Sequence, residues 1–236
     1  MSNEIQRRDF ADDEDLAPAF AEWTADKLRS AIAERGAALL VVSGGKTPAR
    51  YFEALSSMPL DWTRVAVTLA DERRVPDDSP RSNARLVREA LLRNHATVAS
   101  FTPLADVRLS ESQELSAASA RLASLPLPAD VVVLGMGDDG HTASWFPGAD
   151  GLREAMDPSA RRLVAPIQAP GATEPRLTLT GRVILRARTI ALLIEGQDKL
   201  NTLSEALADG PAEAMPIRTV LRGAADRLTI FAAQRV

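Results

Sequence analysis

Short runs of consecutive apolar residues recur along the chain, separated by segments in which apolar residues return at helical spacing. Such runs are typical of strands whose two faces are both buried. The predicted strands are residues 37–42, 65–69, 131–134, 163–167, 190–194 and 228–232. No run approaches the roughly 18–20 apolar residues that cross a membrane.

Helical spacing is clearest near the start of the chain, where Leu16, Phe20 and Trp23 share one face and Gly36 follows as a stop. Further helices are predicted at 48–55, after a cap at Ser82 or Asn83, and at 109–125, 199–207 and 217–221. This alternation predicts an α/β fold, a Rossmann-like and mainly parallel sheet with helices on both faces. We expect a single domain, residues 1–236, with irregular segments at 105–127 and 169–174.

The composition is that of an ordinary globular protein and narrows the possible chemistry. The 236 residues include 28 Lys+Arg and 32 Asp+Glu, a net charge of −4, which argues against a general nucleic-acid binder. The absence of cysteine excludes disulfides, thiolate zinc sites, iron–sulfur clusters and a cysteine nucleophile. The only histidines are His95 and His141, too few for a His-rich metal site.

The first residues hold one weak targeting signal. Arg7 and Arg8 resemble the start of a twin-arginine export signal. Residues 11–15 are acidic, however, where such a signal needs an apolar run. We therefore expect a cytoplasmic protein that does not bind membranes.

Three unusual loops follow predicted strands, where open α/β sheets bind ligands. Residues 43–48, Ser-Gly-Gly-Lys-Thr-Pro, are compatible with a plain turn but also with an anion cradle before a helix. They lack the spacing of a Walker loop.

Residues 71–74, Asp-Glu-Arg-Arg, form the second loop and would usually be a solvated charged stretch. Directly after a buried strand, an arginine there could hold a carboxylate, a phosphate or an oxyanion.

The third loop, residues 135–148, contains His141 two positions after Asp139. A lone histidine is more often structural, but here the aspartate could orient one ring nitrogen while the other acts as a base. The Gly-x-Gly-x-x-Gly spacing is not taken as a dinucleotide site, because its two aspartates would repel a pyrophosphate. His95 is expected to be a surface residue, and nothing marks Ser144 as a nucleophile, since no Gly-x-Ser-x-Gly motif is present.

Taken together, these loops resemble the 6-phosphogluconolactonase family. The match covers nearly the whole chain in order, and its most specific part is Asp-Gly-His-Thr-Ala-Ser at 139–144. Later segments, 176–180 and 196–199, fit as well. Trp145 stands where the family commonly has leucine, a departure that we expect to reshape the pocket wall without touching the chemistry.

The resemblance implies hydrolysis of 6-phospho-D-glucono-1,5-lactone in the oxidative pentose phosphate pathway, on the sugar-phosphate isomerase/deaminase type of fold, without metal or cofactor. It implies His141 as general base, Asp139 as its orienting partner and Arg73 as a stabiliser of negative charge or of the substrate. The implied substrate and phosphate contacts are Gly44, Gly45, Lys46, Thr47, Asp71, Arg176 and Lys199. The oligomeric state is left open.

Two alternatives remain. A glucosamine-6-phosphate deaminase shares the fold, but that family usually has a glutamate where Phe146 stands and a tyrosine where Arg73 stands. A sugar-phosphate-binding protein without catalysis would need the phosphate cradle but no base such as His141. Turnover of the lactone distinguishes these possibilities.

Overall fold

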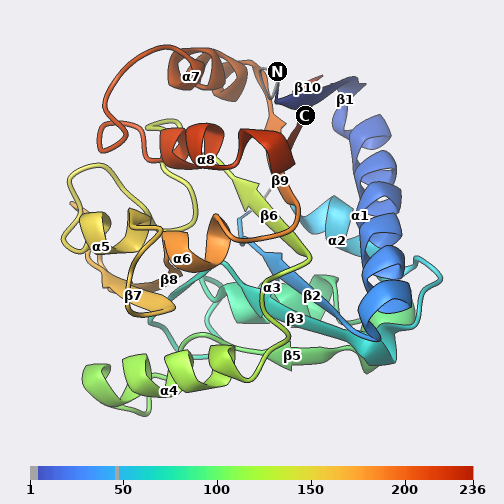
Figure 1. Ribbon diagram of the computed structural model, residues 1–236, viewed down its shortest axis with the longest axis horizontal. Helices are drawn as coiled ribbons and strands as arrows, with labels where there is room; N and C mark the ends of the chain where they lie inside the picture. The colour runs from blue at the N-terminus through green and yellow to red at the C-terminus, as the bar shows by residue number, and fades with distance from the viewer. Residues whose placement is uncertain (1–4, 46–47, 236) are drawn as a thin grey trace.

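The computed structural model describes residues 5–45 and 48–235. Its centre is a seven-stranded sheet in the order β1-β10-β9-β6-β2-β3-β5, and all neighbouring strands in it are parallel (Figure 1). In that order the strands are β1 (Gln6–Asp12), β10 (Leu228–Arg235), β9 (Ile190–Glu195), β6 (Val131–Gly135), β2 (Ala38–Val42), β3 (Val65–Leu69) and β5 (Ser100–Thr102). All five residues of β2 are buried, which explains its continuous apolar run.

Helices cover both faces of this sheet. Figure 1 shows α1 and α2 on one side and α7 and α8 on the other. The helices are α1 (Asp13–Arg35), α2 (Pro48–Ser56), α3 (Asn83–Ala90), α4 (Glu111–Ala123), α5 (Leu152–Met156), α6 (Gly181–Ile184), α7 (Gln197–Leu207) and α8 (Ile217–Gly223). The predicted α/β fold with a mainly parallel sheet is therefore confirmed.

Helix α1 shows how the sequence sets these boundaries. Asp12 caps its first turn by accepting a hydrogen bond from the backbone N–H of Asp15, at 3.1 Å. Gly36 ends it in the left-handed region, with φ of 78°, and donates its N–H to the carbonyl of Ile32. Between these ends, Phe20 packs on Tyr51 of α2 and on Phe231 of β10, with ring centroids 4.3 and 4.6 Å apart. These contacts bind α1 and α2 to the sheet.

A second, three-stranded antiparallel sheet lies beside the first, in the order β4-β8-β7. Its strands are β4 (Asp71–Arg73), β8 (Arg176–Leu179) and β7 (Val164–Ile167). Strand β4 follows β3 with one residue between them, so the chain passes directly from the large sheet into the small one. In the antiparallel register, Arg73 lies opposite Arg176 and Asp71 opposite Thr178.

Several predictions from the sequence were wrong or incomplete. Residues 71–73 are not a polar loop but strand β4, because their backbone pairs with β8. The helix predicted at 109–125 is present as α4, so residues 105–127 are not irregular throughout. Strand β1 was not predicted; its side chains are mostly exposed, and it is held by parallel pairing with β10. The short elements β5, β8, α5 and α6 were also missed.

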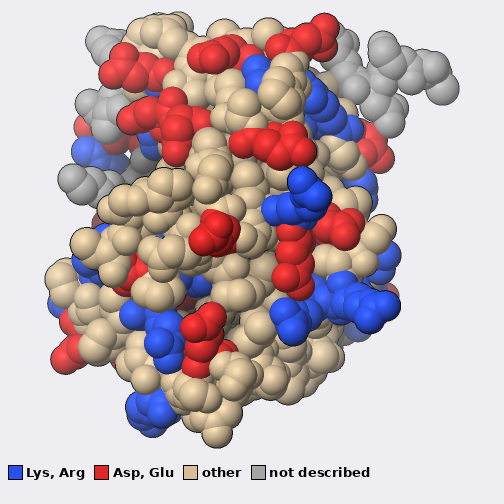
Figure 2. All heavy atoms as spheres, turned by 90° about the vertical axis from the view of Figure 1, so that its left-hand side faces the viewer, with Lys and Arg blue, Asp and Glu red and all other residues tan. Residues whose placement is uncertain are grey.

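Two surface properties follow from the described residues. No helix within residues 5–45 and 48–235 is both long enough and apolar enough to cross a membrane. On the face shown in Figure 2, acidic and basic side chains are interspersed with neutral ones, and neither sign covers the face continuously. The charge of this face matches the near balance of acidic and basic residues in the sequence.

Candidate active site

A cavity of about 200 Å³ lies at the carboxyl ends of the central strands. It takes residues from the ends of β2 and β6, from strands β4 and β8, and from the first turn of α7. Its polar and glycine lining consists of Ser43, Gly44, Gly45, Asp71, Arg73, Asn83, Gly135, Gly137, His141, Arg176 and Lys199. All described residues assigned to the site from the sequence line this cavity, except Asp139, which is hydrogen-bonded to His141. Lys46 and Thr47 fall outside the described residues.

His141 and Asp139 form a hydrogen-bonded pair at the cavity. Nδ1 of His141 lies 2.6 Å from Oδ1 of Asp139, and the backbone N–H of His141 donates to the same oxygen at 3.0 Å. Because a carboxylate only accepts, Nδ1 carries the hydrogen, and Nε2 of the neutral ring is left as an acceptor. Burial raises the pKa of Asp139, but the two hydrogen bonds from His141 outweigh it and hold that pKa below its ordinary value.

Gly137 allows the imidazole to take this position. A Cβ at this residue would lie 2.1 Å from Cε1 of His141, far inside contact distance. The backbone N–H of Gly137 also donates to the carbonyl of His141 at 2.9 Å, which closes the loop. The loop therefore presents His141 against bare backbone, a geometry that a larger residue at 137 would prevent.

Residues after the histidine tie this loop to the small sheet. The buried hydroxyl of Ser144 donates to Oδ2 of Asp71 at 2.5 Å, so Ser144 anchors Asp71. The indole N–H of Trp145 donates to the carbonyl of Leu179 at 3.0 Å, and its side chain is fully buried. Trp145 does not line the cavity. It is a core residue beneath the loop, and its effect on the shape of the pocket stays a prediction.

The glycine loop after β2 approaches Asn83 closely. A Cβ at Gly44 would lie 1.8 Å from Oδ1 of Asn83, whose amide in turn donates to the carbonyl of Asp71 at 2.9 Å. Gly45 has φ of 117°, which favours glycine. The Oγ of Ser43 is buried in the cavity wall and has no hydrogen-bond partner among the described residues. This part of the wall thus offers close backbone approach and one free hydroxyl.

Two arginines face each other across the β4–β8 pair. Arg73 donates from Nη1 to the carbonyl of Arg81 at 2.7 Å. The Nε atoms of Arg73 and Arg176 are both buried without a hydrogen-bond partner in the described part of the chain. Burial lowers the pKa of the Arg176 guanidinium, and the cation of Arg73 lowers it further. An anion in the cavity would relieve both the repulsion and the missing hydrogen bonds.

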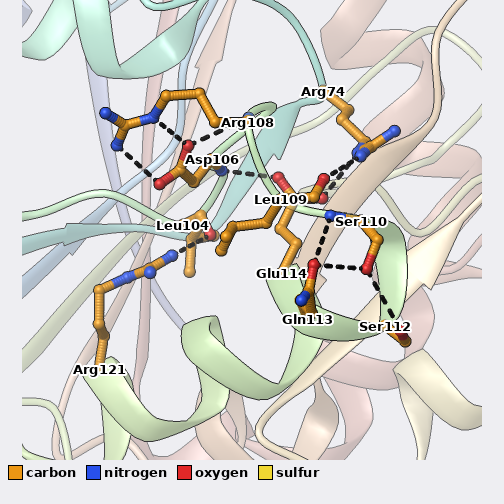
Figure 3. Close-up of polar contacts among 10 residues, drawn as sticks. All are labelled: Arg74, Leu104, Asp106, Arg108, Leu109, Ser110, Ser112, Gln113, Glu114 and Arg121. Atoms are coloured by element: carbon orange, nitrogen blue, oxygen red, sulfur yellow. Dashed lines mark hydrogen bonds and ion pairs between the residues drawn. The ribbon is translucent and has the colours of Figure 1, made fainter.

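Strand β4 is fixed on both sides of Arg73. Before it, the buried carboxylate of Glu72 accepts the backbone N–H groups of Arg73, Asn83 and Ala84 at 2.7–2.8 Å. Burial raises the pKa of Glu72, and these hydrogen bonds oppose that effect. After it, Arg74 donates to the fully buried Glu114 at 2.8 Å (Figure 3).

The hydrogen bonds around Glu114 also involve the loop that precedes α4. Figure 3 shows Arg74 also donating to the carbonyl of Leu109, at 2.7 Å, and the backbone N–H of Asp106 donating to Glu114, at 2.6 Å. Glu114 belongs to α4, so the helix, the loop before it and β4 share one set of polar contacts. Arg73 is therefore held between neighbours anchored on α3 and on α4.

Lys199 enters the cavity from the first turn of α7, close to a group of carboxylates. Burial raises the pKa of Glu195, at the end of β9, to about 7; Asp13 raises it further, while Lys199 and Arg50 act in the opposite direction. Asp13 forms an ion pair with Arg50 of α2 at 2.5 Å. Lys199 thus lines the cavity and also lowers the pKa of the Glu195 carboxyl, against the effect of burial.

Three residues of the site escaped analysis of the sequence as functional side chains. Ser43 lies next to the glycines that were singled out, and its position at a strand end was the available signal. Asn83 was considered as a helix cap and as part of the family resemblance, but not as a residue of the site. Phe146 lies behind His141 and Arg176: its ring centroid is 4.2 Å from that of the imidazole and 4.8 Å from the guanidinium carbon. No local pattern marks such an aromatic contact.

Among residues 5–45 and 48–235, no group of three or more His, Asp or Glu side chains is arranged to hold a metal ion. The expected independence of metals concerns the reaction and stays a prediction.

Comparison with known proteins gives one consistent result. Residues 11–230 match the family model described as glucosamine-6-phosphate isomerases/6-phosphogluconolactonase. The chain is 52% identical over 222 residues to a 6-phosphogluconolactonase of Mesorhizobium japonicum, covering 94% of this chain and 92% of the relative. It is 50% identical over 206 residues to one of Pseudomonas aeruginosa, covering 87% of each chain. The crystal structure of a 6-phosphogluconolactonase from Shewanella baltica superposes with a TM-score of 0.94 at 40% identity, covering 98% of both chains.

Proposed function

Since the chain belongs to the glucosamine-6-phosphate isomerase/6-phosphogluconolactonase family, we propose that it hydrolyses 6-phospho-D-glucono-1,5-lactone with His141 as general base. The product is 6-phospho-D-gluconate, and the reaction belongs to the pentose phosphate pathway. The observation that carries the role of His141 is its hydrogen bond to Asp139 at the wall of an arginine-lined cavity.

The proposed reaction needs one proton carrier. Nε2 of His141 removes a proton from water as the water oxygen attacks the lactone carbonyl carbon, and a tetrahedral oxyanion forms. Collapse of this intermediate breaks the bond between that carbon and the ring oxygen, and the imidazolium returns its proton to the ring oxygen. Asp139 keeps Nδ1 protonated and stabilises the transient imidazolium. A positioned base of this kind contributes roughly 10²–10⁴ in rate.

The cations and the glycine loop hold the substrate in this proposal. Arg73 stabilises the developing oxyanion or the bound substrate, and it is fixed for this task by Glu72 and Arg74 on either side. Arg176, Lys199 and the backbone of the glycine loop bind the phosphate, together with Lys46 and Thr47. Asp71 presents its carboxylate to the sugar hydroxyls while one oxygen stays engaged by Ser144.

The deaminase alternative receives no support from the site. Phe146 offers an apolar ring, which cannot exchange protons during opening of an amino sugar ring. Turnover of glucosamine 6-phosphate by the purified protein would favour this alternative.

We further propose that residues 1–236 act as one domain in the cytoplasm. The cavity takes side chains from Ser43 through Lys199, so separate halves of the chain would each hold an incomplete site. The substrate carries a phosphate and does not cross a lipid bilayer unaided.

The test is an assay with freshly made lactone, coupled to 6-phosphogluconate dehydrogenase, with spontaneous opening of the lactone subtracted. We expect His141→Ala to remove at least 99% of the enzymatic rate, in keeping with a general base. His95→Ala is the matched control, because His95 is exposed and lies outside the cavity, and it should retain the wild-type rate. Equal losses in the two variants, or wild-type turnover by His141→Ala, would show that the base is assigned wrongly.

A further inference from the structure

The ring of Phe146 contacts two groups that the proposed mechanism uses. Its centroid lies 4.2 Å from that of the His141 imidazole, with 33° between the ring planes. The guanidinium carbon of Arg176 lies 4.8 Å from the same centroid. Phe146 is partly buried, packs on the hydrophobic core and does not itself line the cavity. One apolar ring therefore stands behind both the base and a cation.

Neither of these groups is fully fixed by hydrogen bonds. The bond from Nδ1 to Asp139 fixes one atom of His141 but leaves the tilt of the ring around that bond free. The Nε of Arg176 has no partner within the described residues. His141 and Arg176 also come from different elements, the loop after β6 and the start of β8. Contact with the face of Phe146 supplies the restraint that is missing in both cases.

The face of a benzene ring also carries negative electrostatic potential and attracts cations. Arg176 is a cation throughout, whereas His141 becomes one only after it has taken the proton from water. The ring therefore favours the imidazolium over the neutral imidazole. In the proposed mechanism, this imidazolium forms while water attacks the lactone carbonyl.

We propose that Phe146 is a positioning residue: its ring fixes His141 relative to Arg176 and favours the protonated imidazole. This inference rests on the proposed function, because it is there that His141 carries a proton. Phe146 touches the base and the cation, not the reacting atoms.

Several charged groups line the cavity together with His141 or bond to it. Asp139 belongs to the same loop, and the others come from separate elements that line the cavity. They are Asp71 and Arg73 of β4, Arg176 of β8 and Lys199 of α7. Phe146 differs from all of them because it is uncharged, so its electrostatic effect can be varied without changing the net charge of the site.

The experiment replaces Phe146 site-specifically with mono-, di- and trifluorophenylalanine, and separately makes Phe146→Leu. Fluorine weakens the potential of the ring face with little change in shape. The chain has only two histidines, so proton NMR follows both ring titrations, and a His95→Ala spectrum assigns them. The acid limb of kcat/KM is measured on the same proteins.

We expect the titration midpoint of His141 to move to lower pH in the order of fluorine content, and by about half a pH unit in Phe146→Leu. The acid limb of kcat/KM should move with it, and kcat should fall several-fold in Phe146→Leu. Phe101→Leu is the matched control. The guanidinium carbon of Arg88 lies 5.3 Å from the centroid of the Phe101 ring, but Phe101 belongs to β5 and lies outside the cavity. It should move neither the titration of His141 nor the acid limb.

An unchanged midpoint of His141 across the fluorinated series and Phe146→Leu would overturn the inference, even if kcat fell, because loss of packing alone predicts that result. The proposed function fails separately. If the wild type does not hydrolyse the lactone while the midpoint of His141 still follows fluorination, the ring acts on His141 as inferred but the reaction is assigned wrongly.

Discussion

Replacement of Arg176 by methionine should weaken binding of the phosphorylated substrate and at the same time stabilise the fold. Arg176 lies opposite Arg73 in the antiparallel register, and its Nε is buried without a partner in the described chain. Methionine keeps much of the side-chain volume but removes the charge. The substitution therefore removes both a repulsion and an unpaired buried donor from the protein without ligand.

The magnitude follows from the hydrogen bonds that a phosphate would form with the guanidinium. Charge-assisted bonds of this kind contribute about 1.5–3 kcal/mol, so Arg176→Met should lower kcat/KM for the phosphorylated lactone by roughly 10- to 150-fold. Glucono-1,5-lactone without phosphate should be a poor substrate for the wild type, and its kcat/KM should change less than about threefold, because it presents no such anion. The free energy of unfolding should rise by about 0.5–1 kcal/mol, since an unpaired buried donor is removed.

The assay measures kcat/KM for both lactones on the wild type, Arg176→Met and Arg186→Met, with chemical denaturation of each protein. Arg186 is the control because it is exposed and lies outside the cavity lining. Equal losses on the two lactones would refute the reasoning, because they would mean that Arg176 supports the chemistry or the structure and not phosphate recognition. A fall in the free energy of unfolding would refute the argument from repulsion.

Three further predictions concern metals, the glycine loop and pH. Exhaustive chelation should leave the lactonase rate unchanged, because a water activated by histidine suffices for an activated ester; loss of activity that one divalent ion restores would contradict this. Gly44→Ala should lower kcat/KM at least tenfold, since its Cβ would lie 1.8 Å from Oδ1 of Asn83. Adding Asn83→Ala to this variant should recover part of the loss, because it removes that atom. Measurement of kcat/KM for the single and the double variant tests this, and no recovery would contradict the steric explanation. Burial and the nearby Asp13 raise the folded-state pKa of Glu195 to about 7, so its contribution to stability is fully present below the ordinary pKa of 4.5 and is lost as the pH rises through 7. Glu195→Gln should therefore be more stable than the wild type at pH 8, by about 1 kcal/mol because the carboxylate is partly exposed and solvent screens its charge, and similar to it at pH 4; equal urea midpoints at pH 8 would contradict the raised pKa.

The sequence by itself determined the five inner strands of the large sheet and most of the helices that cover it. Strands such as β2 and β6 are buried on both faces, so they must be apolar throughout, and that requirement is visible in the local pattern. Gly36 ends α1 through a left-handed conformation that glycine adopts without strain, which is also a local property. The loop that holds Asp139 and His141 is local as well, because the two side chains are only two positions apart and their contact spans a single turn.

Only the tertiary structure decided the small sheet and the wall of the cavity. Arg73 and Arg176 are 103 positions apart and meet because β4 pairs with β8, yet the sequence Asp-Glu-Arg carries no strand pattern of its own. The same holds for β1, whose exposed polar residues form a strand because β10 offers a free edge. Trp145 lies in the core, where its indole N–H donates to the carbonyl of Leu179, 34 positions away in the sequence. In each case the decisive energy comes from a partner distant in sequence, and no local pattern of apolar and polar residues records which partner that will be.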